Sequence, residues 1–141
     1  MEQLVEFAGN NLILSVIWVA LAVMLVFSFV NSTFSPVKEL GTHDATLQIN
    51  KQDAVVLDIR AAAEFKKGHI LGAKQLKPEE IREAQFGKLE KHKGTPIIVA
   101  CAMGSSARKT AMQLSKAGFP LVSVLKGGMN AWTGAGLPVN K

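Results

Sequence analysis

The sequence predicts one α/β domain with a mainly parallel sheet, preceded by a single membrane-spanning helix. Two observations support this fold class. From residue 40 onward, short apolar runs alternate with helix-forming segments, and glycine, proline or polar turn residues separate them. Upstream, the nineteen residues 12–30 carry no charge. A chain of 141 residues has room for one domain of ordinary size together with such an anchor.

The uncharged run at 12–30 has the length of a membrane span. As a helix that rises about 1.5 Å per residue, it covers about 28 Å, close to the roughly 30 Å hydrocarbon core of a bilayer. A buried core helix of a soluble protein would be shorter and would carry a polar stripe. A cleavable signal peptide would begin with basic residues, whereas Glu2 and Glu6 precede this run. A permanent transmembrane helix fits better than either alternative.

The chain therefore divides into four segments. We expect an extracytoplasmic stub at 1–11, a transmembrane helix at 12–30, a linker at 31–39 and a domain at 40–140. All 16 Lys and Arg residues lie beyond the helix, beginning with Lys38. Because basic residues tend to stay on the cytoplasmic side of a membrane, we expect the amino terminus outside and the domain in the cytoplasm.

Positive charge dominates the part of the chain after the anchor. Residues 38–141 hold 16 basic and 9 acidic residues, a net charge of +7. This excess indicates either an ordinary solvated surface or attraction to anionic lipids of the inner leaflet. Nucleic-acid binding is not expected, because the charge is dispersed and no basic run is interleaved with stacking aromatic residues.

The first half of the domain begins with a helix and a strand. Thr42 is a candidate cap for a helix over 43–50. The run at 54–57 is apolar throughout and ends at Asp58, as a strand buried on both faces would. Residues 61–67 favour a helix that stops at the following glycine.

The second half repeats this alternation. Pro78 opens a short helix with two glutamates in its first turn, where carboxylates meet the positive end of the helix dipole. Residues 96–100 predict a second buried strand, and 107–116 predict an amphipathic helix. Residues 121–125 predict a further strand. A tight turn at two glycines then leads into a short helix that carries Trp132, a candidate core residue.

Reactive side chains follow two of these strands. Asp58 and Arg60 come after the strand at 54–57, and Cys101 comes directly after the strand at 96–100. The carboxyl ends of parallel strands meet at one edge of a sheet, where sites in open α/β folds lie. We therefore expect these three residues at one site. The favoured role of Asp58 and Arg60 is to pair and brace the active loop, and direct substrate contact is the alternative.

The segment after Cys101 predicts an anion-binding loop. Small residues lead at once into a helix, so that loop amides and the helix amino terminus can face an anion. The loop consists of Ala102, Met103, Gly104, Ser105, Ser106 and Ala107, and Ser105 or Ser106 is a candidate helix cap. Arg108 and Lys109 add positive charge. In this setting we expect a reactive thiolate at Cys101, although a free cysteine is also often a small buried hydrophobe.

The cysteine count restricts the chemistry further. Cys101 is the only cysteine, so an intramolecular disulfide is impossible and any thiol chemistry must finish on another molecule. No Cys/His cluster has the spacing of a zinc site, and we expect neither a metal nor a cofactor. In a phosphatase or arsenate reductase loop, five residues separate the cysteine from an arginine. Counted from Cys101, that arginine position is Ala107, so the sequence does not favour either of these enzymes.

Five segments of the chain form one ordered pattern: 55–60, 64–73, the loop from Cys101, 125–128, and 131–132 with 136–139. Together they resemble the signature of the rhodanese-like superfamily. The layout also resembles the single-domain members anchored in bacterial inner membranes. The resemblance implies a five-stranded parallel sheet flanked by helices, and transfer of sulfane sulfur through a persulfide on Cys101. Catalytic single-domain members commonly carry arginine five positions after the cysteine, where this chain has Ser106.

Two functions follow from these patterns. The favoured one is a single-pass membrane sulfurtransferase that moves sulfane sulfur from a small-molecule or protein donor through Cys101 to a thiol or other nucleophile. The alternative is a rhodanese-like docking module at the inner membrane with little or no turnover. Arg108 is expected to support the loop. His69, near a helix end, is expected to bond to backbone rather than to act as a base.

The charge distribution gives a first testable prediction. Protease added to intact spheroplasts is expected to leave residues 38–141 uncut, because the domain faces the cytoplasm. An immunoblot against the domain, before and after lysis of the spheroplasts, measures this protection. Digestion of the domain before lysis would reverse the predicted orientation.

Overall fold

The computed structural model describes residues 1–33 and 36–141. The chain forms an amino-terminal helical unit and a compact unit that begins at Pro36. The two units are described separately.

The helical unit contains α1 (Glu2–Asn10) and α2 (Leu12–Thr33). The helices are separate because Asn11 leaves helical geometry, with φ −127° and ψ 53°, while its backbone N–H still donates to the Phe7 carbonyl at 3.0 Å. Within α2, the stretch Leu12–Val30 is long and apolar enough to cross a membrane, and none of it is buried. A helix with apolar side chains on all sides suits a lipid environment better than water.

The linker expected at 31–39 is shorter in the structure. Residues 31–33 continue α2. At the other end, Lys38–Leu40 forms a strand, β1. Residues 34–35 of the expected linker lie outside the described part of the chain.

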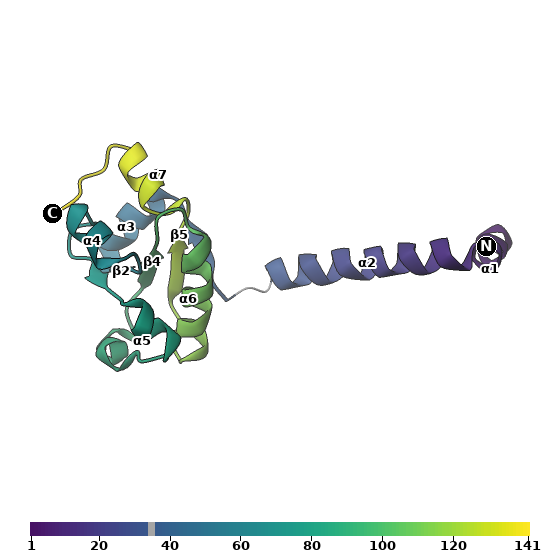
Figure 1. The fold of residues 1–141 in the computed structure, drawn as a ribbon, viewed down its shortest axis with the longest axis horizontal. Coiled ribbons are helices and arrows are strands. Elements are labelled where there is room, and N and C mark those ends of the chain that lie inside the picture. Colours follow the sequence, from purple (N-terminus) through teal and green to yellow (C-terminus); the bar gives the residue numbers. More distant parts are fainter. Residues whose placement is uncertain (34–35) are drawn as a thin grey trace. The chain divides into compact units, whose positions relative to one another are not determined.

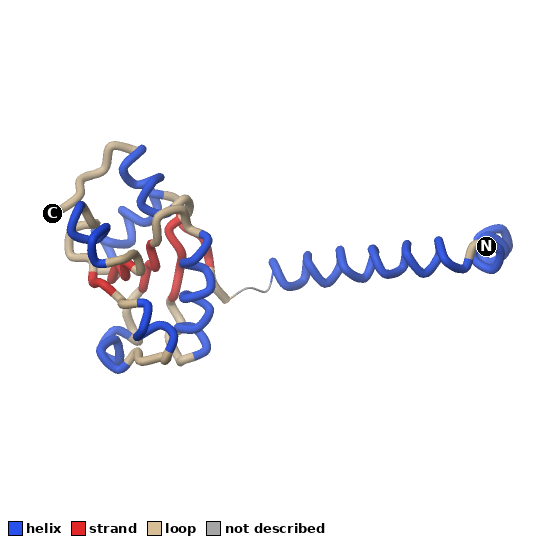
Figure 2. The backbone as a smooth tube through the Cα atoms, viewed as in Figure 1, coloured by secondary structure: helices blue, strands red, loops and turns tan. Residues whose placement is uncertain are grey.

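A five-stranded parallel sheet forms the centre of the compact unit, in the order β1-β5-β4-β2-β3 (Figures 1 and 2). The predicted α/β fold with a five-stranded parallel sheet flanked by helices is confirmed. The strands after β1 are β2 (Val55–Asp58), β3 (Lys74–Gln75), β4 (Ile97–Ala100) and β5 (Val122–Leu125).

The residue patterns alone missed the two edge strands. β1 has the sequence Lys-Glu-Leu and β3 has Lys-Gln, so neither shows an apolar run or an alternation. Each pairs with one neighbour and keeps one edge unpaired, where charged side chains are favoured. The central strand β4 is the opposite case, since all four of its residues are buried.

Helices cover both faces of the sheet. Buried residues of η1 and α6 lie in one core cluster, against which the partly buried Ile81 of α5 packs. Buried residues of α3 and α7 lie in a second cluster on the opposite face. The bounds are α3 (Thr42–Gln52), α4 (Ala62–Lys67), α5 (Pro78–Arg82), the 3-10 helix η1 (Gly87–His92), α6 (Ser105–Lys116) and α7 (Gly128–Gly134).

Two predicted helix caps are wrong. Thr42 is the first helical residue of α3, and Gly41 is the cap; the Thr42 carbonyl accepts a bond from the Thr46 hydroxyl at 2.7 Å. At α6 the cap is Gly104, whose φ of 97° places the loop in a left-handed conformation before the helix begins. Ser105 therefore begins the helix and does not cap it. In both cases the sequence analysis placed the start of the helix one or two residues too late.

Candidate functional site

The sheet brings the predicted site residues to one edge. β2 and β4 are neighbours and parallel, with Asp58 aligned to Ala100. The pairing continues one residue further, where the Ile59 N–H donates to the Ala100 carbonyl at 3.0 Å. Asp58, the last residue of β2, and Cys101, which directly follows β4, thus lie at the same carboxyl edge, as the sequence analysis expected.

The Cys101 side chain is 5% exposed and lies at the boundary of the core. Its Sγ accepts a hydrogen bond from the Gly104 N–H at 2.8 Å. The turn favours glycine at position 104 for two reasons. A Cβ there would lie 3.2 Å from the Gly127 amide nitrogen, and the positive φ disfavours other residues. An N–H aimed at sulfur stabilises a thiolate more than a thiol.

The amino-terminal end of α7 holds the loop from the other side. The Met129 N–H donates to the Cys101 carbonyl at 2.7 Å, and the Asn130 N–H donates to the Ala102 carbonyl at 3.1 Å. Both carbonyls therefore face α7. In a trans peptide the N–H points opposite to the carbonyl, so the N–H groups of Ala102 and Met103 point away from α7.

Those two N–H groups are available to a ligand. Within the described residues, neither the Ala102 N–H nor the Met103 N–H donates to a protein acceptor. Because they lie beside Cys101 and point away from α7, they are suited to bind a negatively charged atom held on the sulfur. The Met103 side chain is 71% exposed.

Close contact between the loop and α7 requires glycine at position 128. Gly128 has φ of 60°, and a Cβ there would lie 2.2 Å from the Cys101 carbonyl oxygen. No side chain fits at that distance. The sequence analysis interpreted the glycine pair as a tight turn only; two glycines between a strand and a helix also permit this backbone approach.

Asp58 and Arg60 form the predicted pair. The Asp58 carboxylate is 1% exposed and accepts from the Arg60 Nε at 3.0 Å and from its Nη2 at 2.6 Å. Nη2 also donates to the Gly68 carbonyl at 2.8 Å. The hydrogen bond to Asp58 raises the pKa of Arg60. The pair was expected to brace the active loop, but within the described residues neither side chain bonds to residues 101–107. The pair instead joins the end of β2 to the end of α4, because Arg60 Nη2 reaches the Gly68 carbonyl.

Arg108 forms an ion pair with the edge strand β1 and lines a pocket with Met103 and Gly104 of the loop. Its Nη1 is 3.2 Å from the Glu39 carboxylate of β1, and both side chains are about half exposed. Arg108 was expected to support the loop, and Glu39 was missed because β1 was not recognised as a strand. Ala107 was expected in the anion-binding loop, but it is fully buried in the first turn of α6.

Two other marked residues have structural roles, as expected. The His69 Nδ1 lies 2.9 Å from the Phe65 carbonyl, and its ring stacks on Phe65 with centroids 3.9 Å apart. Trp132 is buried, and its Nε1 donates to the Pro138 carbonyl at 3.0 Å. Within the described residues, no group of three His, Cys, Asp or Glu side chains is arranged to hold a metal ion.

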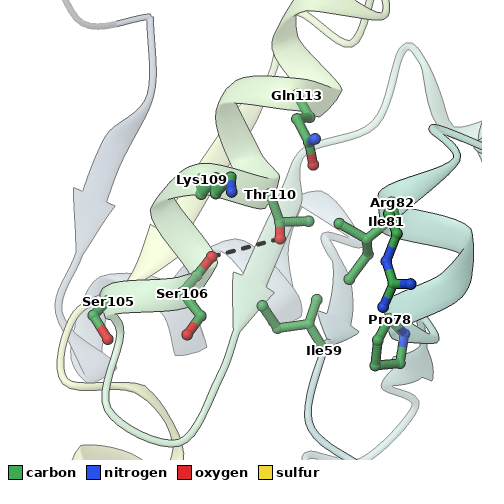
Figure 3. Close-up of a pocket in the computed structure, with 9 residues that line it drawn as sticks. All are labelled: Ile59, Pro78, Ile81, Arg82, Ser105, Ser106, Lys109, Thr110 and Gln113. Atoms are coloured by element: carbon green, nitrogen blue, oxygen red, sulfur yellow. Dashed lines mark hydrogen bonds between the residues drawn. The ribbon is translucent and has the colours of Figure 1, made fainter.

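A cleft of about 600 Å³ lies between α5 and α6, next to the loop (Figure 3). Ser105 and Ser106 line it at the start of α6. Figure 3 shows Arg82 on α5 across the cleft from Lys109 on α6. Among these residues, the sequence analysis had identified the serines and Lys109 as candidate site residues. Arg82 belongs to no sequence motif, and only the fold places it at the cleft.

Comparison with known proteins places this geometry in a family. The model of the rhodanese-like domain matches residues 42–135. The YibN protein of Escherichia coli strain K12 is 43% identical over 139 residues, which cover 99% of this chain and 97% of YibN. The thiosulfate sulfurtransferase GlpE of Pseudoalteromonas translucida is 37% identical over 87 residues, covering 62% of this chain and 80% of GlpE.

Solved structures agree with these sequence matches. The crystal structure of a rhodanese-related protein from Thermoplasma volcanium superposes with a TM-score of 0.65 at 26% identity. The superposition covers 73% of this chain and 97% of that protein.

Gly128→Ala tests the contact between α7 and the loop. We expect the free energy of unfolding to fall by about 2–4 kcal/mol, because the new Cβ meets the Cys101 carbonyl and the backbone is left-handed. We also expect slower alkylation of Cys101 by iodoacetamide under native conditions. Gly134→Ala is the matched control, since a Cβ at the end of the same helix meets nothing within 4 Å. Equal stability and alkylation rates in the two variants would contradict this role of Gly128.

Proposed function

The chain belongs to the rhodanese-like family, and on that basis we propose that it is a sulfurtransferase that carries sulfane sulfur as a persulfide on Cys101. The observation that carries the proposal is the arrangement around Sγ. Gly104 donates to the sulfur, and the N–H groups of Ala102 and Met103 are free beside it. The similarity to proteins named thiosulfate sulfurtransferase supports the same reaction class.

In the first step the Cys101 thiolate attacks the sulfane sulfur of a donor. A new S–S bond forms as the donor's own bond to that sulfur breaks, and the donor leaves with the bonding electron pair. With thiosulfate the leaving group is sulfite. The terminal sulfur of the persulfide is then an anion, which the Ala102 and Met103 amides can stabilise without moving.

In the second step an external nucleophile receives the sulfur. The persulfide first takes up a proton from water. An acceptor thiolate then attacks its terminal sulfur, the S–S bond to Cys101 breaks, and Cys101 leaves as a thiolate. The acceptor carries away the sulfur and its proton as a persulfide. Because the chain has one cysteine, no second thiol of the protein can take the sulfur. The covalent intermediate divides one difficult transfer into two easier ones.

The proposed setting is the bacterial inner membrane, with α2 as a single-pass anchor and the domain in the cytoplasm. The length and apolar surface of α2 support the anchor. The absence of Lys and Arg before α2, against 16 after it, supports the orientation. The net charge of +7 in residues 38–141 favours contact with anionic lipid headgroups.

Mass spectrometry of the protein purified from cells tests the sulfur transfer. We expect a fraction of the protein to be heavier by one sulfur atom at Cys101, and this mass to disappear on incubation with a thiol. Cys101→Ser should carry no added sulfur and should transfer none. If Cys101 is unmodified and neither thiosulfate nor a persulfide donor loads it, the domain serves as a docking module and is not an enzyme.

Ser106→Arg tests the choice of donor. Thiosulfate is a dianion, and Ser106 cannot provide the charged, bidentate bonds of a guanidinium. We expect weak use of thiosulfate by the natural protein and ready loading from a neutral persulfide donor. The arginine variant should gain roughly ten- to a hundredfold in kcat/KM with thiosulfate, which corresponds to about 1.5–3 kcal/mol. Its rate with the persulfide donor should change little.

The control for this experiment is Arg108→Ala. Because the Arg108 side chain pairs with Glu39, its removal should leave the reaction rates with both donors unchanged. Equal gains with both donors in Ser106→Arg, or no gain with either, would contradict this account of donor choice.

A further inference from the structure

The cleft between α5 and α6 is a second polar site beside the loop. Its lining combines an apolar part with two cations from different helices (Figure 3). Ligand sites for small molecules have volumes of about 300–1,000 Å³, and this cleft measures about 600 Å³. It is therefore of a size for a small molecule.

Both cations of the cleft are free to bind an anion. Arg82 of α5 and Lys109 of α6 are exposed, and among the described residues neither pairs with a carboxylate. No Asp or Glu is among the lining residues. A guanidinium and an ammonium on opposite walls are suited to bind carboxylate groups, the guanidinium by paired hydrogen bonds.

Gln113 supplies an unpaired polar atom at the same site. Its Oε1 is buried and has no hydrogen-bond partner among the residues that the structure describes. Figure 3 shows this side chain on α6 directed toward the cleft. A buried acceptor without a donor costs about 1–3 kcal/mol, so a ligand N–H that reaches it would remove this cost. A peptide group offers such an N–H.

The apolar part of the cleft connects it to Cys101. Ile59 and Ile81 line the cleft and pack against the core cluster that contains Cys101. Ser105 and Ser106, which follow the loop directly, line its end. The cleft therefore opens on the same face of the sheet as the sulfur. A persulfide extends about 2 Å beyond Sγ, the length of an S–S bond.

From these four features we infer that the cleft binds the acceptor of the sulfur, a low-molecular-weight peptide thiol with carboxylate groups. Arg82 and Lys109 hold the carboxylates, and Gln113 accepts a peptide N–H. The thiol end points toward the loop, where it attacks the terminal sulfur as described above. This inference rests on the proposed function for its reaction, but the binding itself can be tested without any turnover.

Binding is measured with S-methylglutathione, which has the carboxylates and peptide groups but no thiol. The full chain in detergent micelles is titrated by calorimetry. We expect Arg82→Gln and Lys109→Gln each to weaken binding by about five- to tenfold, because each loses a partly solvated charged hydrogen bond. Lys116→Gln is the matched control on α6, outside the cleft, and should bind as the natural protein does. Absence of binding, or equal binding by all variants, would overturn the inference.

Transfer kinetics give the second measurement. Protein loaded with sulfur at Cys101 is mixed with glutathione or with uncharged 2-mercaptoethanol. We expect Arg82→Gln to raise the KM for glutathione about five- to tenfold and to leave the rate with 2-mercaptoethanol unchanged. An equal loss with both thiols would place Arg82 at the reacting sulfur and overturn the inference. The same assay is run with reduced thioredoxin as the acceptor. A slower transfer by Arg82→Gln to thioredoxin alone would overturn the inference in favour of a protein acceptor.

The two proposals fail in different ways. If S-methylglutathione binds with the expected dependence but Cys101 never takes up sulfur, the cleft is a peptide-binding site and the sulfurtransferase proposal is wrong. If Cys101 is loaded and discharged but the cleft variants bind and react as the natural protein does, the sulfurtransferase stands and the acceptor site is wrong.

Discussion

Two backbone hydrogen bonds, from the amides of Met129 and Asn130 to the carbonyls of Cys101 and Ala102, determine the geometry of the site. They turn the first two peptide groups of the loop so that the carbonyls face α7 and the N–H groups face the other way. Only glycine at position 128 allows the helix to come close enough for these bonds. The anion binding that we propose for the loop therefore rests on the backbone and on its contact with α7, and it does not require any charged side chain in the loop.

The buried ion pair of Asp58 and Arg60 stabilises a different part of the same sheet edge. Asp58 is the last residue of β2 and is aligned with Ala100 of β4, and the Arg60 side chain joins it to the Gly68 carbonyl at the end of α4. A buried carboxylate without a partner would be costly, whereas this one accepts bonds from both the side chain and the backbone N–H of Arg60. The pair fixes the turn after β2, and β2 is the strand that lies directly beside the one that presents Cys101.

How far sequence could predict this structure depended on the type of signal. β2, β4 and β5 are apolar runs, and their strand character and the convergence of Asp58 and Cys101 followed from them. β1 and β3 were not predicted from their residues, because two or three polar edge residues have no periodicity to detect. The partner of Arg108 was missed for the same reason, since Glu39 lies on β1. The cleft was missed because Arg82 and Gln113 are 31 positions apart in the chain and only packing of α5 beside α6 brings them together.

The amides of the loop and the cations of the cleft form two separate binding surfaces. In the proposed reaction the loop amides act on the sulfur attached to Cys101, so they would favour the persulfide regardless of the donor that supplied it. Selection among reactants must then come from side chains around the loop. Ser106 occupies the position of the usual loop arginine, and it brings no charge to this end of the cleft. The positive charge instead lies further along the cleft, on Arg82 and Lys109. In the inferred complex these two cations hold the carboxylates of the acceptor. The proposed arrangement thus places side-chain discrimination at the acceptor step and not at the donor step.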